Sequence, residues 1–269
     1  MSDNPRPASL DAILAVTRTR VEALKERADE LERAAQQGPP IRPFPGAPAP
    51  TVGVIAEVKR RSPSQGAIRE DLDPVAHARA YVRGGAVAIS VLTDEVHFGG
   101  SLEDLKRVAA AVRMPLLRKD FVINEVQIHE ARAAGASAVL LIARIVHANQ
   151  LDALARMVRW LDMTPLIEVH APDELDAALA AGKGSFVLGI NARDLDTFNV
   201  DLRAAEELIR RIPAGLPVIA ESGIETRADV ERFAAAGVDF VLVGTSVARQ
   251  PDPERAVKAL VGVKRQARV

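Results

Sequence analysis

The chain has 269 residues with 35 basic and 36 acidic side chains, and this formal net charge of −1 gives no electrostatic footprint for nucleic acid or an anionic membrane. It contains no cysteine, and its five histidines lack metal-ligand spacing, so we expect no disulfide, no thiolate nucleophile and no metal site. The polar N-terminus lacks the apolar stretch of a signal peptide, and no apolar run approaches the roughly 18 residues that cross a bilayer, so we expect a cytoplasmic protein.

The first predicted element is one helix over residues 9–37, which Ser9 can cap and whose apolar residues recur at helical spacing. A stretch with six prolines in twelve residues follows over 39–50, and it predicts an extended linker. We therefore expect residues 1–50 to form an N-terminal helical extension with a linker, and residues 51–269 to form the main domain.

Short apolar runs then alternate with helical patterns, which predicts βαβ units and a parallel sheet. The predicted strands are 52–58, 86–92, 115–119, 137–142, 164–169, 185–190, 216–221 and 238–243. Pro115, Pro165 and Pro217 each open a predicted strand, where proline gives up no ladder hydrogen bond. Glycines that end the helices before the even strands suit the left-handed position, and they are Gly84, Gly135, Gly182 and Gly237.

The spacing of these prolines shows a repeat of two βα units, and four such repeats give eight parallel strands. Eight parallel strands with crossover helices close into a (β/α)8 TIM barrel, so we predict an α/β protein of this class with an extra N-terminal helix. An open doubly wound sheet is the competing architecture, and no G-x-G-x-x-G turn follows the first strand to support it.

The odd-numbered predicted strands end in charged residues, at the edge of a barrel where active sites lie. These residues are Glu57 and Lys59, Lys119, Glu168 and Glu221. Neighbouring lysines and carboxylates tune which group holds a proton, so the cluster predicts general acids and bases. A structural network of ion pairs is the alternative, because buried charges need partners of opposite sign.

The loops after the last two strands contain Glu221-Ser222-Gly223 and Gly244-Thr245-Ser246. Barrels of this class bind phosphate there, through backbone N–H groups and a helix N-terminus. We therefore expect a phosphate site at Gly223, Gly244 and Thr245, with a substrate contact at Ser222.

Polar and aromatic residues at other strand ends are candidate substrate contacts. Asn191 and Arg193 can bind hydroxyls and an anion, although Arg193 can instead pair with Asp194. Ser62 can donate to an anion or form part of a turn. Phe98 and Phe121 can stack on a planar substrate or pack in the core.

Eight motifs in the order of the chain resemble the indole-3-glycerol phosphate synthase family. They are IAEVKRRSPS, AISVLTDEVHFGGSLEDL, LLRKDFVI, EARAAGASAVLLI, LIEVH, LGINARDL, AESGI and FVLVGTS. The resemblance implies conversion of 1-(2-carboxyphenylamino)-1-deoxy-D-ribulose 5-phosphate to indole-3-glycerol phosphate, carbon dioxide and water in tryptophan biosynthesis. It also implies that neither a cofactor nor a metal is needed.

The resemblance implies a role for each candidate residue. Lys119 matches the general acid that protonates the ketone oxygen, Glu168 matches the acid/base of the dehydration, and Lys59 is a rival or partner acid there. Residues that match orienting groups are Glu57, Glu221 and Asn191. Ser62 and Arg193 match contacts to the substrate anion. The phosphate contacts are matched by Gly223, Gly244 and Thr245. The pocket around the anthranilate ring is matched by Phe98, Phe121, Leu140 and Leu195.

Two positions depart from the family pattern. Ala192 replaces the second asparagine of GINNRDL, which puts a loop hydrogen bond in doubt, and Asn124 stands where an aspartate is common. Two other functions stay open: a phosphosugar isomerase or Schiff-base aldolase with Lys119 as nucleophile, and a silent barrel that binds a phosphorylated ligand. The expected partner is a small phosphosugar–anthranilate substrate, with neither nucleic acid nor membrane, and the expected state is a monomer or weak dimer.

Overall fold

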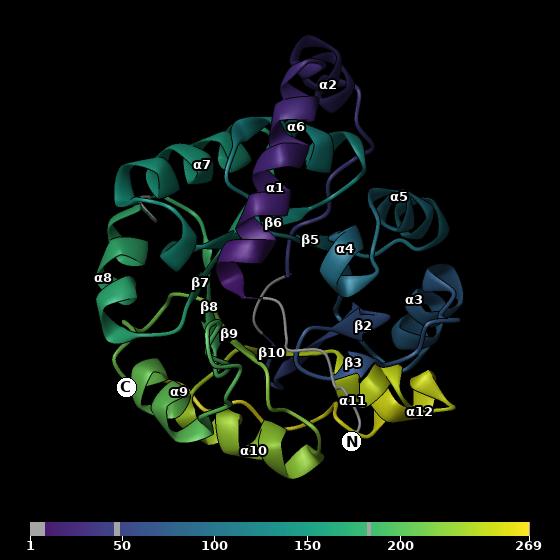
Figure 1. Ribbon diagram of the computed structural model, residues 1–269. Helices are drawn as coiled ribbons and strands as arrows, with labels where there is room; N and C mark the ends of the chain where they lie inside the picture. Colours follow the sequence, from purple (N-terminus) through teal and green to yellow (C-terminus); the bar gives the residue numbers. More distant parts are fainter. Residues whose placement is uncertain (1–8, 46–48, 182–183, 269) are drawn as a thin grey trace, which may run out of the picture.

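Eight parallel strands close into a barrel with helices around it (Figure 1) in a computed structural model that describes residues 9–45, 49–181 and 184–268. The barrel strands follow one another in chain order, and the last closes on the first. They are β1 (Gly53–Val58), β4 (Ala88–Leu92), β5 (Leu116–Lys119), β6 (Ala138–Ile142), β7 (Thr164–Val169), β8 (Val187–Asn191), β9 (Val218–Glu221) and β10 (Phe240–Val243). The predicted (β/α)8 class is confirmed, and the open sheet is wrong.

The crossover helices pack on the outside of the barrel (Figure 1). They are α3 (Pro74–Arg83), α5 (Leu102–Ala111), α6 (Glu125–Ala133), α7 (Ala148–Trp160), α8 (Pro172–Ala181), α9 (Leu202–Ile209) and α10 (Arg227–Ala236), with α11 (Thr245–Ala248) and α12 (Pro253–Lys258) after the last strand. Shorter elements are the pair β2 (Arg61–Ser62) and β3 (Gly66–Ala67), α4 (Glu95–Phe98) and a 3-10 turn, η1 (Ala143–Ile145). Among the described residues, no helix is both long enough and apolar enough to span a membrane.

Strand residues alternate between two apolar layers, which explains why the strands are apolar along their whole length. On β1, Ile55 belongs to the cluster inside the barrel, whereas Val54 and Ala56 pack with the surrounding helices. The two-residue period then carries the next inward position to the mouth of the barrel. Four inward apolar residues are each followed two positions later by a charged one: Ile55 by Glu57, Leu117 by Lys119, Leu166 by Glu168, and Ile219 by Glu221.

Two of the three strand prolines lie one residue outside the strands that they were predicted to open. Pro115 and Pro217 immediately precede β5 and β9, and Pro165 is the second residue of β7. The carbonyl groups of Pro115 and Pro217 accept hydrogen bonds from neighbouring strands at 3.1 and 3.0 Å. Proline is tolerated there because these positions need an acceptor and no donor.

The predicted left-handed glycines are correct at two positions and wrong at one. Gly135 and Gly237 have φ of 91° and 95°, as expected just past a helix. Gly84 keeps a helical φ of −69°, and Gly85 takes the left-handed turn with φ of 97°. A Cβ at Gly84 would lie 2.6 Å from the carbonyl oxygen of Glu254, so this glycine is required by a close approach. Gly182 lies outside the described residues.

The N-terminal segment forms two helices, so the prediction of one helix over 9–37 is wrong. Ser9 caps α1 (Leu10–Lys25) as expected, but the chain leaves helical geometry at Arg27 before α2 (Ala28–Gln36) begins. The break lets each helix use a different surface: α1 crosses the mouth of the barrel, and α2 packs on α6 (Figure 1). In the described part of residues 39–50 there is no helix or strand.

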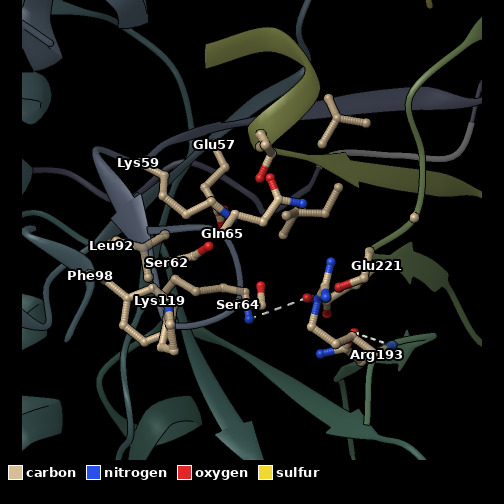
Figure 2. Close-up of a pocket in the computed structure, with 18 of the residues that line it drawn as sticks. Glu57, Lys59, Ser62, Ser64, Gln65, Leu92, Phe98, Lys119, Arg193 and Glu221 are labelled. Atoms are coloured by element: carbon tan, nitrogen blue, oxygen red, sulfur yellow. Dashed lines mark hydrogen bonds and ion pairs between the residues drawn. The ribbon is translucent and has the colours of Figure 1, made fainter. Parts of the chain in front are cut away.

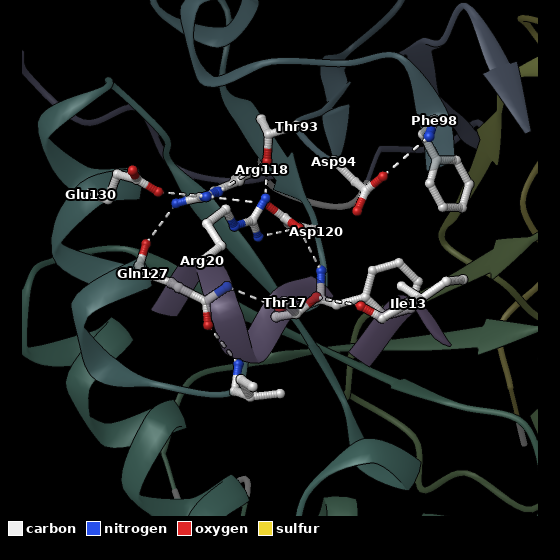
Figure 3. A network of polar contacts seen from close by, with 12 residues as sticks. Ile13, Thr17, Arg20, Thr93, Asp94, Phe98, Arg118, Asp120, Gln127 and Glu130 are labelled. Carbon is white, nitrogen blue, oxygen red and sulfur yellow. Dashed lines mark hydrogen bonds and ion pairs between the residues drawn. The ribbon is translucent and has the colours of Figure 1, made fainter. Parts of the chain in front are cut away.

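A buried ion pair joins α1 to the strand that carries Lys119 (Figure 3). Arg20 on α1 donates to Asp120 at 2.8 Å, and Arg118 donates to the other oxygen of Asp120 at 3.0 Å. Although burial opposes ionisation of Asp120, Arg118 and Arg20 lower its pKa to about 2. The carboxylate that follows Lys119 is therefore charged and held from two sides.

Asn124 begins α6 with a capping box. Its side chain accepts from the backbone N–H of Val126 at 3.1 Å, and the side chain of Gln127 accepts from the backbone N–H of Asn124 at 3.1 Å. Either asparagine or aspartate supplies the oxygen that this position needs. The departure at Asn124 therefore affects a helix cap and leaves the residues at the barrel mouth unchanged.

We expect Asn124→Ala to lower the free energy of unfolding by about 1 kcal/mol, because the cap oxygen is lost. Asn124→Asp keeps the oxygen and is the matched control, with stability close to that of the parent chain. Chemical denaturation followed by circular dichroism measures both variants. Equal destabilisation by alanine and aspartate would contradict the assigned cap.

Candidate active site

A cavity of about 490 Å³ opens at the carboxyl ends of the barrel strands (Figure 2). All of the predicted site residues line it: Glu57, Lys59, Ser62, Phe98, Lys119, Phe121, Leu140, Glu168, Asn191, Arg193, Leu195, Glu221, Ser222, Gly223, Gly244 and Thr245. The fold thus brings together residues that are far apart in the sequence. Among the described residues, no group of three or more histidine, cysteine, aspartate or glutamate side chains is arranged to hold a metal ion.

Lys119 lies between two buried carboxylates. Its Nζ is 2.9 Å from Oε2 of Glu168 and 3.3 Å from Oε2 of Glu221, and Figure 2 shows the side chain reaching across the cavity toward Glu221. Burial opposes the charge of the ammonium group, but Glu168, Glu221 and Glu57 together raise the pKa of Lys119 above its ordinary value. Lys119 is therefore a protonated donor that faces the cavity.

The two carboxylates beside Lys119 have opposite pKa shifts. Glu168 receives hydrogen bonds from Lys119 and, at 3.1 Å, from Nδ2 of Asn191, and the attraction of Lys119 and His170 outweighs burial and lowers its pKa. Glu221 has no hydrogen-bond partner among the described residues, and burial together with the nearby Glu168 outweighs the attraction of Lys119 and raises its pKa. Pairs whose environments push their pKa values apart are typical of acid–base sites.

A second lysine–carboxylate pair lies at the end of β1. The Nζ of Lys59 is 2.8 Å from Oε1 of Glu57, as expected for residues two apart on one face of a strand. The other oxygen of Glu57 accepts from Ser90 at 3.4 Å, and Tyr81 donates to the backbone carbonyl of Glu57 at 3.3 Å. Lys59 is thus the second lysine of the cavity, held by a different carboxylate.

Two glycines leave room for these carboxylates. A Cβ at Gly189 would lie 2.4 Å from Oε1 of Glu221, and a Cβ at Gly244 would lie 2.4 Å from Oε1 of Glu57. Gly244 was predicted to lie in a phosphate loop, and Gly189 was not among the predicted site residues. A glycine inside a buried strand was the available signal, because it often marks a close approach by another group.

The loops after β9 and β10 have unusual backbone geometry where they line the cavity. Ser222 and Gly223 both have left-handed conformations, with φ of 67° and 71°. Gly244 precedes α11 and has no side chain that could cap it. The first backbone N–H groups of that short helix therefore have no hydrogen-bond partner within the helix. Both loops contribute to the cavity wall.

Another part of the lining is apolar. The rings of Phe98 and Phe121 are 6.1 Å apart at their centroids and tilted by 40°. Both belong to the apolar cluster inside the barrel, together with Leu140 and Leu195. Core packing and a cavity-facing position therefore coexist at these residues, and the two readings of Phe98 and Phe121 are not exclusive.

Arg193 has no acidic partner among the described residues. Its guanidinium donates to the carbonyl oxygen of Phe198 at 2.8 Å, and its backbone N–H donates to Oδ1 of Asn191 at 3.0 Å. The alternative pairing with Asp194 is wrong, because Asp194 pairs with Arg144 at 3.0 Å. A half-buried guanidinium without a carboxylate partner suits an anionic ligand.

Ser62 belongs to the short β2–β3 pair, which the sequence analysis did not predict. Its hydroxyl is buried at the cavity wall and has no hydrogen-bond partner among the described residues. An unpartnered buried hydroxyl fits contact with a bound ligand.

Ala192 has the opposite environment, because its side chain packs with the helix-facing core. Its backbone forms hydrogen bonds with the backbone of Glu221 at 2.9 Å and of Asp201 at 2.8 Å.

The sequence analysis also missed His170. It lies two residues after Glu168, and its Nε2 is 3.3 Å from Oε1 of Glu168. The same two-residue spacing had singled out Glu57 and Lys59, so a signal was present. The histidines were considered only as metal ligands, and His170 was passed over because it lacks metal-ligand spacing.

Comparisons with known proteins agree over nearly the whole chain. A family model described as indole-3-glycerol phosphate synthase matches residues 10–260. Relatives with that name include one from Mycolicibacterium smegmatis, 45% identical over 94% of this chain and 93% of the relative. Another is from Rhodopirellula baltica, 46% identical over 94% of this chain and 98% of the relative.

Solved structures add support for the fold. A thiamine phosphate pyrophosphorylase from Pyrococcus furiosus has a TM-score of 0.59 at 18% identity, covering 78% of this chain and 93% of the other. A 3-hexulose-6-phosphate synthase from Salmonella typhimurium has a TM-score of 0.60 at 13% identity, covering 78% and 96%. At such low identity these likenesses establish the barrel and nothing finer.

We expect Gly189→Ala to lower the turnover rate by about 100-fold, because the new methyl group displaces the Glu221 carboxylate by about an ångström. Steady-state kinetics measures the loss, and thermal unfolding confirms that the barrel is intact. Glu221→Asp shortens the displaced side chain and completes a double-mutant cycle. If the two single losses simply multiply in the double variant, Gly189 and Glu221 do not interact as described.

Proposed function

The chain belongs to the indole-3-glycerol phosphate synthase family, and from this premise we propose how the residues of its cavity divide the reaction. The enzyme is a carboxy-lyase of tryptophan biosynthesis. It converts 1-(2-carboxyphenylamino)-1-deoxy-D-ribulose 5-phosphate to indole-3-glycerol phosphate, carbon dioxide and water. The reaction comprises a ring closure, a decarboxylation and a dehydration.

Lys119 is the general acid of the ring closure. The aromatic carbon attacks the ketone carbon, and the ketone oxygen needs a proton as it gains negative charge. The observation that carries this assignment is the ammonium group of Lys119, held by Glu168 and Glu221 at the wall of the cavity. The same contacts argue against an aldolase, because a protonated amine is no nucleophile.

Glu168 and Lys59 serve the dehydration. Decarboxylation restores the aromatic ring, after which the former ketone oxygen leaves as water and needs both a base and an acid. Glu168 is ionised and can accept a proton, while Lys59 is paired with Glu57 and can donate one. Glu57, Glu221 and Asn191 orient these groups, since each contacts one of them or its partner.

The substrate lies across the cavity with its ring and its phosphate at opposite ends. The ring packs in the apolar part formed by Phe98, Phe121, Leu140 and Leu195. The phosphate meets the backbone of the two loops that contain Ser222, Gly223, Gly244 and Thr245. Ser62 and Arg193 bind the substrate carboxylate or a hydroxyl between these ends, where both have free donors. Holding both ends fixes the attacking carbon near the ketone.

The enzyme acts in the cytoplasm as a monomer without a cofactor, with residues 1–50 as an extension and 51–269 as the catalytic barrel. All residues assigned to the reaction belong to this chain, so the proposed chemistry needs no group from a second copy. The assigned steps are proton transfers among lysine and glutamate side chains. Its partner is a small molecule.

We expect Lys119→Met to lower the turnover rate by about 10³-fold, because a general acid contributes about 10² to 10⁴-fold. Purified enzyme is mixed with the carboxyphenylamino-deoxyribulose phosphate without added metal, and indole fluorescence is followed. Lys59→Met is the matched control, and it is expected to slow the dehydration while leaving the ring closure intact.

Equal rates for the parent chain and Lys119→Met would remove Lys119 from the role of acid. Substrate binding without turnover by the parent chain would instead favour a silent barrel. Covalent trapping of substrate on Lys119 by borohydride would indicate a Schiff base and contradict the proposed mechanism.

A further inference from the structure

His170 lies behind Glu168, on the side away from the cavity. It follows β7, its side chain is 2% exposed, and it does not line the cavity. Its Nε2 is 3.3 Å from Oε1 of Glu168, and its Nδ1 is 3.3 Å from Oε2 of Glu174 on α8. The imidazole thus separates two carboxylates and contacts one with each nitrogen.

Glu174 is itself fixed as an anion. It accepts from the backbone N–H of His170 at 2.7 Å and from Nε of Arg144 at 2.7 Å. Burial raises the pKa of Glu174, but His170 and Arg144 outweigh burial and lower it. The carboxylate that faces Nδ1 is therefore charged, and it favours an imidazole with protons on both nitrogens.

The contacts form a row of alternating charge from the cavity to the rim of the barrel. Its members are Lys119, Glu168, His170, Glu174 and Arg144, and Arg144 also pairs with Asp194 and Asp196 of the loop after β8. The charged groups that act on the imidazole are Glu168 from β7 and Glu174 from α8. Lys119 on β5 acts on it only through Glu168, and Arg144 of η1 only through Glu174.

Lys119 alone is an incomplete counter-charge for Glu168. It is shared with Glu221, and in the proposed ring closure the proton passes from its Nζ to the ketone oxygen, so that a neutral amine remains. A buried carboxylate that loses its only cation is strongly destabilised and takes up a proton. Glu168 would then be neutral in the step that needs it as a base.

We propose that protonated His170 is a positioning residue that carries the second positive charge on Glu168, so that Glu168 stays ionised and aligned after Lys119 gives up its proton. This inference rests on the proposed roles of Lys119 and Glu168. His170 touches neither the substrate nor the cavity, and it acts on the reaction through Glu168.

The titration of His170 follows from its two acidic neighbours. Burial opposes the imidazolium, but Glu168 and Glu174 raise the pKa of His170 to about 9. Because the folded-state pKa lies above the ordinary value of 6.5, His170 keeps its positive charge through neutral pH and loses it as the pH rises through about 9. The support for Glu168 is thus present at neutral pH and disappears in alkaline solution.

The first measurement is an imidazole ¹⁵N NMR titration of the parent enzyme, with the His170 signals assigned by their loss in His170→Gln. We expect His170 to stay protonated at pH 7.5 and to titrate near pH 9. Titration near pH 6.5 would overturn the proposal. This readout needs no turnover, so it stands even if Lys119→Met shows that the proposed acid is wrong.

The second measurement is the single-turnover rate as a function of pH for His170→Gln, which keeps a side-chain donor but removes the charge. We expect a loss of about tenfold at neutral pH and an acid limb shifted upward by about one pH unit, because an opposite charge lowers a carboxyl pKa by about 1–3 units. We expect the parent enzyme to lose activity above about pH 9, where His170 loses its charge. The variant should lack this alkaline limb of the pH profile.

His129→Gln is the matched control, because His129 is a half-buried histidine on α6 without a place in the site. It is expected to keep the parent pH profile. Circular dichroism and thermal unfolding separate a folding defect from the expected effect. A folded His170→Gln enzyme with the parent rate and pH profile would overturn the proposal.

Discussion

Lys119 is 2.9 Å from Glu168 and 3.3 Å from Glu221, and one ammonium group cannot neutralise two buried carboxylates. The excess negative charge has to be removed by protonation or balanced by another cation. Glu221, without a hydrogen-bond partner among the described residues, is the group whose pKa rises. Glu168, supported by Asn191 and His170, is the group that stays ionised. The shortage of positive charge thus gives the two glutamates different properties.

The barrel makes this crowding possible because its strands deliver every second side chain to the same interior. Carboxylates from β1, β7 and β9 and the lysine of β5 meet at the mouth without any local sequence contact. Glycine on the neighbouring strand β8 and after β10 then leaves the volume that the carboxylates occupy. The same two-residue period that builds the apolar core therefore also determines which charges face the cavity.

The two-residue alternation of side chains along the strands and the number of strands could be predicted from the sequence, because both depend on local patterns. Leu117 and Lys119 are two residues apart and therefore point to the same side of their strand. This spacing is visible in the chain, and so is the family resemblance of the motif that contains them. The break at Arg27 was not visible, because the helical stripe continues and only the separate surfaces of the barrel mouth and α6 require two helices. For Gly189 and His170 the sequence held only a partial signal, because their roles also depend on Glu221 from β9 and Glu174 from α8.

The position of Lys119 is constrained from its outer side as well. Its neighbours Arg118 and Asp120 pair with each other at 3.0 Å, and Arg118 also pairs with Glu130 of α6 at 2.7 Å, while Arg20 ties Asp120 to α1 (Figure 3). These contacts fix the backbone on both sides of the lysine to two helices. The N-terminal helix therefore helps to hold the strand end that carries Lys119, although it contributes none of the groups assigned to the chemistry.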